Sequence, residues 1–171
     1  LIKMLNLSPA TPGIIFASII FNDSVSLDEV KSIWNDKFDT FKIFKPEFNP
    51  SLAYYSKEMG DNLERLIFFS SRKVAREEMV DFKLWATEVE RETAKNNKRS
   101  LNIDIGLICL EQVLLSTSKP YSHRIYLNDG IYAELTYTYE NKSYHFLPWT
   151  YPDYQHQEKI DLFNSLRSQL F

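Results

Sequence analysis

Apolar positions along the first two thirds of the chain switch between the period of a strand and the period of a helix. Residues 14–21 form a continuous apolar run, which predicts a strand buried on both faces. Ser26 and Glu29 have the spacing of a capping box, so a helix is expected to begin there and to run to about residue 38. The same analysis predicts four further elements: a short strand at 41–48, a strand at 63–74, a helix at 76–95 with an apolar stripe, and a strand at 101–105.

This order of elements, strand-helix-strand-strand-helix-strand, matches the ferredoxin-like βαββαβ arrangement, in which two helices cover one face of an antiparallel sheet. We therefore expect an α+β fold with this core at about residues 13–105. Gly106 is expected to permit a bend after the core. Residues 107–115 fit a short helix or a strand, and the shared face of Leu107, Leu110 and Leu114 favours the helix.

The rest of the chain predicts an elaboration of that core at about residues 106–171. Further antiparallel strands are expected at 122–127, 131–139 and near 144–147, followed by a C-terminal helix at about 157–170. They would extend the sheet and cap it. Because no internal repeat, low-complexity tract or Gly/Ser linker divides the chain, residues 1–171 are expected to form a single domain.

The turn between the first two of these added strands decides which side chains meet across the hairpin. A two-residue turn would place Arg124 opposite Leu135, whereas a three-residue loop at 128–130 places it opposite Glu134 and requires a left-handed glycine. A slip of one residue sends side chains to the wrong face of a sheet. Only the second register separates apolar from polar side chains, so we expect that register, with His123 on the apolar face.

Composition and charge exclude several classes of protein. The chain has 171 residues and a formal net charge of −3 without a concentrated basic stripe, which argues against a nucleic-acid-binding surface. The single cysteine, Cys109, lies in an apolar run, so it is expected to be inert packing in a reducing cytoplasm. No apolar stretch approaches the roughly 20 residues that span a bilayer, so no membrane partner is expected. Lys83, Glu88 and Glu90 are expected to form the solvated face of their helix.

No compact catalytic or metal-binding motif is present. The four glycines are isolated, so they form neither a P-loop nor a dinucleotide-binding fingerprint, and HExxH and GxSxG motifs are absent. Asp104, His123 and Glu134 are residue types that bind metals, but the expected register points His123 away from Glu134. We therefore expect no metal site, and the sequence defines no cofactor.

Arg124 and Glu134 carry the hypothesis of a functional site. They are either an exposed cross-strand pair worth about 0.2–1 kcal/mol, or a site in which the arginine fork binds a carboxylate or phosphate and the glutamate orients it. The aromatic segment 148–154 either pins the last helix to the sheet or forms a stacking wall beside Arg124. The candidate ligand-binding residues are Asn102, Asp104, Lys119, Arg124, Tyr126, Tyr132, Glu134, Trp149, Tyr151 and Asp153.

Four segments of the second half resemble a bacterial protein family. They are Asn102 to Gly106, Lys119 to Leu127, Gly130 to Glu134 and Trp149 to Tyr154. These segments are similar to the family described as domain of unknown function 4416, and the resemblance covers nearly the whole chain. The family usually has Asp-Pro-Gly-Tyr where this chain has Asp-Ile-Gly-Leu at 104–107, so no role of a rigid turn or a tyrosine transfers there. The resemblance implies bacterial origin and a cytoplasmic location, and it implies no activity.

Together these patterns favour a binding module for a small anionic ligand of a nucleotide-like or sugar-phosphate-like kind. Two alternatives stay open: an enzyme of unknown reaction at the same site, acid–base or metal-assisted, and a structural or protein-interaction domain. A homo-oligomer is compatible with each. In the binding interpretation Arg124 is exposed, so Arg124→Ala would abolish binding and leave the melting temperature nearly unchanged.

Overall fold

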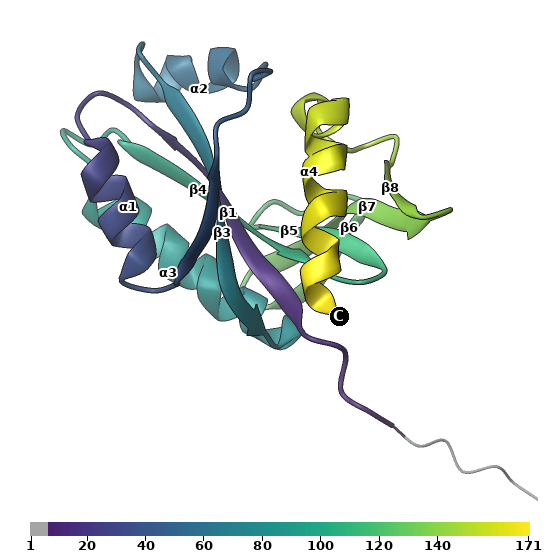
Figure 1. The fold of residues 1–171 in the computed structure, drawn as a ribbon. Coiled ribbons are helices and arrows are strands. Elements are labelled where there is room, and N and C mark those ends of the chain that lie inside the picture. The colour runs from purple at the N-terminus through teal and green to yellow at the C-terminus, as the bar shows by residue number, and fades with distance from the viewer. Residues whose placement is uncertain (1–6) are drawn as a thin grey trace, which may run out of the picture.

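The fold was obtained as a computed structural model, which describes residues 7–171 (Figure 1). Helices and strands alternate in the first half, and strands dominate the second half until the last helix. The elements are β1 (Gly13–Phe21), α1 (Leu27–Asn35), β2 (Thr40–Phe44), α2 (Leu52–Met59), β3 (Glu64–Val74), α3 (Met79–Glu92), β4 (Leu101–Ile108), β5 (Gln112–Thr117), β6 (Arg124–Asn128), β7 (Ile131–Glu140), β8 (Ser143–Phe146) and α4 (Gln157–Arg167). Within residues 7–171 no helix is long and apolar enough to cross a membrane.

All eight strands of the described chain belong to one antiparallel sheet, in the order β2-β3-β1-β4-β5-β7-β6, with β8 also paired to β7. Helices α1 and α3 lie against one face, and α4 lies against the other (Figure 1). The predicted α+β class with an antiparallel sheet is therefore confirmed. Helix α2 was not predicted, and it separates β2 from β3 along the chain.

Strand β1 supplies both hydrophobic cores because its side chains alternate between the two faces of the sheet. Ile15, Ala17 and Ile19 pack into the core beneath α1 and α3. Ile14 and Phe16 pack into the second core, beneath α4. All nine residues of β1 are buried, which confirms the prediction of a strand covered on both faces.

The capping box of α1 is present as predicted. The backbone N–H of Ser26 donates to the Glu29 carboxylate at 2.7 Å, and the backbone N–H of Glu29 donates to the Ser26 hydroxyl at 3.2 Å. The helix ends at Asn35, a turn before the predicted residue 38.

Two charged residues of α3 contradict the prediction of a solvated helix face. The Ile103 N–H donates to the Glu90 carboxylate at 2.6 Å, and Lys83 Nζ donates to the Ile103 carbonyl at 3.0 Å. Both side chains are buried, whereas Glu88 is exposed. They satisfy the backbone of β4 where β5 does not pair with it, since β5 joins β4 only from Gly106 onward.

The predicted helix at 107–115 is wrong. Leu107 and Ile108 complete β4, and residues 112–117 form β5, which pairs back on β4. The spacing of three leucines suggested a helix, but burial in a sheet sandwiched between helices also accounts for a continuous apolar run. Gly106 makes no bend, because it lies inside β4. The position suits glycine because a Cβ there would collide with the Phe16 ring.

The hairpin has the predicted pairing but a different turn. Arg124 lies opposite Glu134, and Gly130 has a φ of 78°, both as predicted. Asp129 also has a positive φ, of 48°, so the turn contains two residues, and a bulge after Tyr126 restores the register. The structure thus combines the shorter turn with the pairing expected for the longer one.

The predicted separation of faces holds only in part for β7 and fails for β6. On β7, Ile131 and Ala133 are buried as predicted, but Glu134 and Thr136 on the predicted polar face are buried too. On β6, the edge strand of the sheet, Ile125 and Leu127 are exposed.

Candidate functional site

Arg124 and Glu134 form a buried ion pair at the start of the hairpin. Arg124 Nε donates to Glu134 Oε2 at 2.7 Å, and the two side chains are 3% and 2% exposed. The other two nitrogens of the guanidinium group donate to the Lys119 carbonyl at 2.9 Å and to the Tyr151 hydroxyl at 3.0 Å. The interpretation as a solvated surface pair is therefore wrong. Arg124 links β6, the segment before it and the aromatic loop.

His123 lies beside the ion pair, contrary to the prediction that it faces away from Glu134. Its Nε2 atom is 3.1 Å from Glu134 Oε2, the oxygen that also accepts from Arg124. The residue precedes the first residue of β6, so the alternation of a strand does not apply to it. The other oxygen, Glu134 Oε1, is buried without a hydrogen-bond partner in the described part of the chain.

Three rings form a stack over this pair, which we call the ring ladder: Tyr121, His123 and Trp149. The His123 ring lies 6.0 Å from the Tyr121 ring and 5.3 Å from the Trp149 ring, with interplanar angles of 5° and 18°. The Arg124 guanidinium lies 4.5 Å from the centre of the Tyr121 ring. Trp149 is fixed by its indole N–H, which donates to the Leu135 carbonyl at 2.8 Å. The ladder therefore holds the imidazole in one orientation.

Tyr151 extends from the aromatic loop, residues 147–155, toward the same pair. Its hydroxyl accepts from Arg124, and burial raises the pKa of the phenol, with the Glu134 carboxylate acting in the same direction. The loop itself is tied to β7, because the Thr150 hydroxyl donates to the Thr136 carbonyl at 2.7 Å. The position of Tyr151 is thus set by the sheet.

The polar end of β4 supplies the next two candidates. Asn102 is buried, and its amide donates to Asp104 at 3.0 Å and accepts from Arg99 at 2.9 Å. The Asp104 side chain is 37% exposed. Burial raises the pKa of Tyr55 on α2, and the Asp104 carboxylate raises it further, so that tyrosine lies within electrostatic reach of Asp104.

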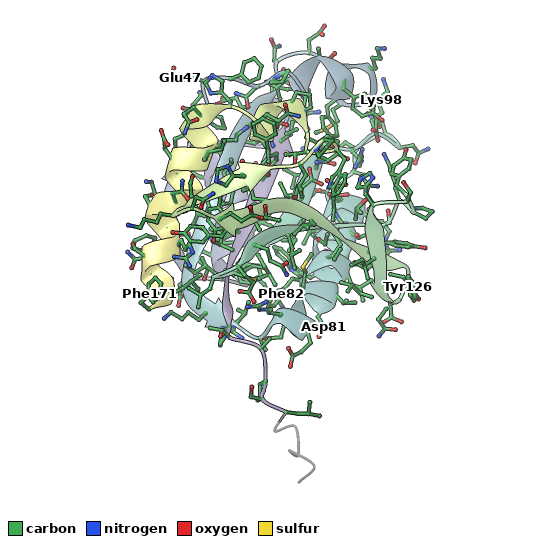
Figure 2. The ribbon with its side chains drawn as sticks, turned by 90° about the vertical axis from the view of Figure 1, so that its right-hand side faces the viewer. Glu47, Asp81, Phe82, Lys98, Tyr126 and Phe171 are labelled. Carbon is green, nitrogen blue, oxygen red and sulfur yellow. The ribbon has the colours of Figure 1, made fainter. Side chains whose placement is uncertain are left out.

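Tyr126 and Tyr132 do not join this cluster. They face each other across the hairpin with ring centres 5.2 Å apart, and Tyr126 lies at the outer edge of the sheet (Figure 2). Lys119 contributes its carbonyl to Arg124, while its side chain is exposed.

Asp153 belongs to a second buried charge cluster, which sequence analysis missed. Its carboxylate forms an ion pair with Arg65 of β3 and lies 3.5 Å from Lys159 Nζ of α4. Arg65 also donates to the Ser18 hydroxyl at 2.7 Å. All four side chains are buried. Burial lowers the pKa of Lys159 to about 7, and the positive charge of Arg65 acts in the same direction.

Metal-binding side chains and the single thiol are the remaining chemical features of residues 7–171. No group of three or more His, Cys, Asp or Glu side chains there is arranged to hold a metal ion. Cys109 is a buried free thiol whose pKa burial raises to about 11, as expected for packing.

Two surface hollows lie away from the predicted residues. One, of about 320 Å³, lies between α1 and the end of α3, and the other, of about 270 Å³, lies between β8 and α4. Neither of these two hollows is lined by a candidate ligand-binding residue.

The fold and this cluster define an α+β protein whose sheet carries a buried Arg–Glu pair under a layer of exposed rings. The family model described as domain of unknown function (DUF4416) matches residues 11–170, and the chain belongs to that family. No curated protein and no solved structure matches the chain. The resemblance noted from the sequence is thereby confirmed.

The burial of Arg124 reverses the sequence-based expectation for Arg124→Ala. Removing one partner of a buried ion pair leaves the other charge unpaired, so we expect a loss of about 3–5 kcal/mol in the free energy of unfolding. The double variant Arg124→Met/Glu134→Leu should lose less than Arg124→Ala alone, because it leaves no buried charge. Urea unfolding of the wild type, Arg124→Ala and the double variant measures these free energies. A melting temperature unchanged by Arg124→Ala would show that the pair is not structural.

The lowered pKa of Lys159 predicts that the free energy of unfolding rises with pH. The folded-state pKa of about 7 lies below the ordinary 10.5. Between these values the unfolded chain binds a proton that the folded chain does not, so the free energy of unfolding rises with pH. The limiting slope for one proton is about 1.4 kcal/mol per pH unit. Urea unfolding between pH 7 and roughly 9.5 should show a smaller slope for Lys159→Met than for the wild type. Equal slopes would contradict the low pKa.

Proposed function

We propose that the chain binds a small anionic ligand that carries a flat ring or a sugar. The site consists of the exposed faces of the ring ladder, Tyr151, the Lys119 side chain and the polar end of β4. The observation that carries the proposal is the placement of exposed rings directly beside a buried, fixed ion pair.

The rings support the flat part of the ligand. Tyr121, Trp149 and Tyr151 are 60%, 38% and 48% exposed, although aromatic side chains of this size are normally packed. Two of them are fixed by hydrogen bonds, Trp149 to the sheet and Tyr151 to Arg124. Stacking of a flat group on such a ring contributes about 1–3 kcal/mol, with little entropy left to lose.

Lys119 supports the anionic part. Its side chain is exposed on the segment between β5 and β6. The pKa of Glu58 on α2 is lowered by its hydrogen bonds to Arg99, and the charge of Lys119 acts in the same direction. Lys119 therefore lies within electrostatic reach of Glu58, whose partner Arg99 also donates to Asn102. An ammonium group there pairs with a phosphate or carboxylate as a point charge.

Two carboxylates and an amide support the hydroxyl or N–H groups of the ligand. Asp104 is partly exposed, and Asn102 lies beside it. Glu134 Oε1 is a buried acceptor without a donor in the described chain. Such an oxygen is costly to leave unpaired, and because it is buried a ligand donor reaches it only if neighbouring side chains move.

In this proposal Arg124 does not bind the ligand directly, in contrast to the sequence-based hypothesis. Each of its three nitrogens already donates to a protein acceptor, so the arginine positions Glu134 and Tyr151 rather than gripping the anion. Tyr126, Tyr132 and Asp153 are not included in the site, because they contact other parts of the molecule.

We also propose three properties that bear on this role. The first half is a ferredoxin-like unit with α2 inserted, supported by the antiparallel order β2-β3-β1-β4 and by α1 and α3 on one face. Residues 13–171 form one domain, supported by the sheet that runs through both parts. The location is a bacterial cytoplasm, supported by the free thiol of Cys109.

A second candidate function is protein interaction through β6. This edge strand exposes Ile125 and Tyr126 by 70% and 57%, and the segment Ile125–Asn128 carries no charged side chain to discourage pairing. A second copy of the chain could pair there edge to edge. We expect light scattering after gel filtration to show a dimer that Ile125→Lys converts to a monomer. A wild-type monomer at every concentration tested would exclude this homodimer.

Ligand binding is tested by thermal shift with nucleoside monophosphates, sugar phosphates and dicarboxylates. A member present at 100 times its dissociation constant should stabilise the protein by about 2.7 kcal/mol. By calorimetry, Lys119→Ala should weaken binding of that compound about 10- to 100-fold, the effect of losing one charge-assisted hydrogen bond. Trp149→Ala should weaken binding and also destabilise the fold.

Lys42→Ala is the matched control, because Lys42 is an exposed lysine on β2 at the opposite edge of the sheet. It should bind like the wild type. The proposal fails if no compound of the three classes shifts the melting temperature, or if Lys119→Ala and Lys42→Ala bind equally.

A further inference from the structure

The imidazole of His123 is held at one edge and free at the other. Its Nε2 atom lies 3.1 Å from Glu134 Oε2, and its ring lies nearly parallel to those of Tyr121 and Trp149. Its Nδ1 atom makes no hydrogen bond with residues 7–171 and is accessible to solvent. The side chain as a whole is 22% exposed. The ring therefore has a single edge at which it can meet another molecule.

The hydrogen bonds define which nitrogen carries the proton. Arg124 Nε can only donate, so Glu134 Oε2 accepts from it. The ionised carboxylate has no proton to give, and Nε2 of His123 must therefore donate to the same oxygen. Neutral His123 then carries its proton on Nε2 and a lone pair on Nδ1.

We infer that His123 is a general base that acts on the ligand of the proposed site, with Glu134 as its positioning residue. This inference rests on the proposed function and deepens it, because it makes the chain an enzyme. The reaction class is hydrolysis or transfer at an ester of the anionic ligand.

The step needs no further reactant than a hydroxyl group or a water molecule. Nδ1 takes the proton of that O–H group, the O–H bond breaks, and its electron pair stays on the oxygen. That oxygen forms a bond to the ester centre as the bond to the leaving oxygen breaks. The leaving oxygen departs with the electron pair and takes the proton back from Nδ1.

Three features support this role over simple packing. The carboxylate is buried and held by Arg124, so it can stabilise the imidazolium that forms without moving. The ladder prevents rotation of the ring. The polar neighbours that a substrate needs, Lys119 and Tyr151, contact the same arginine.

The two other histidines of the chain are internal controls. His145 Nε2 lies 3.0 Å from a backbone carbonyl, and His156 stacks on Phe48. The nearest carboxylate to His156 is that of Glu158, 3.9 Å away, and it is not held by an arginine. Neither imidazole lies within hydrogen-bond distance of a carboxylate that an arginine holds.

Diethyl pyrocarbonate acylates unprotonated imidazole nitrogen, so its rates compare the reactivity of the three histidines in one experiment. Per-residue rates come from mass spectrometry of one sample over a range of pH. We expect His123 to react several-fold faster than His145 and His156, although its side chain is less exposed than that of His156, at 22% against 49%. The groups that face it and set its pH profile are Glu134, Arg124, Tyr121 and Trp149.

Glu134→Gln should slow the reaction of His123 and leave the rates of His145 and His156 unchanged, which also verifies that the variant is folded. If that variant does not fold, the comparison of the three histidines in the wild type still decides the question. A His123 rate at or below both others overturns the inference.

The two proposals fail in different ways. If His123 is reactive but no compound shifts the melting temperature, the ligand proposal fails and the inference about the reactivity of His123 stands. A bound phosphate or carboxylate compound that leaves the His123 rate unchanged separates the ligand from the histidine and overturns the inference. Protection of His123 by the compound supports both.

Discussion

The buried pair of Arg124 and Glu134 is the interaction on which the second half of the molecule depends. One guanidinium group joins three segments, because it donates to Glu134 on β7, to the Lys119 carbonyl before β6 and to Tyr151 in the aromatic loop. A buried ion pair need not add stability compared with apolar side chains. It does specify geometry, since neither charge can leave without a large cost. The register of the hairpin and the position of the loop are thereby set together.

The second constraint is the divergence of the sheet between β4 and β5. These strands pair only from Gly106 to Ile108, so the first part of β4 has a free edge. Lys83 and Glu90 satisfy the backbone of that edge at Ile103, which keeps the strand from pairing elsewhere. The divergence leaves Asp104 partly exposed, within electrostatic reach of Tyr151. A continuous sheet would have covered this position with a neighbouring strand.

Sequence reasoning predicted the pairing of Arg124 with Glu134, because hydrophobic segregation requires Ile131 and Ala133 of β7 to be buried, as they are. It predicted neither the burial of Glu134 on the other face of β7 nor the exposure of Ile125 on the edge strand β6. At residues 107–115 it missed the turn between β4 and β5, because the apolar residues on the two sides of that turn resemble one helical run. The Arg65–Asp153 pair joins residues 88 positions apart in the sequence, and a local sequence pattern cannot predict such a contact. His123 was misplaced because it precedes the strand whose alternation was applied to it.

The aromatic loop is clamped by two arginines from different regions of the sheet. Tyr151 accepts from Arg124 of β6, and two residues later Asp153 pairs with Arg65 of β3. Strand β6 is one edge of the sheet and β3 is next to the other edge strand, β2, so the loop bridges distant regions of the sheet. A loop fixed at two points so close together has little freedom between them. The exposed ring of Tyr151 is consequently held in place, and that of Trp149 is held by its own hydrogen bond to the Leu135 carbonyl. Stacking of a ligand on these two rings would therefore carry little ordering cost, because the rings are ordered before any ligand arrives.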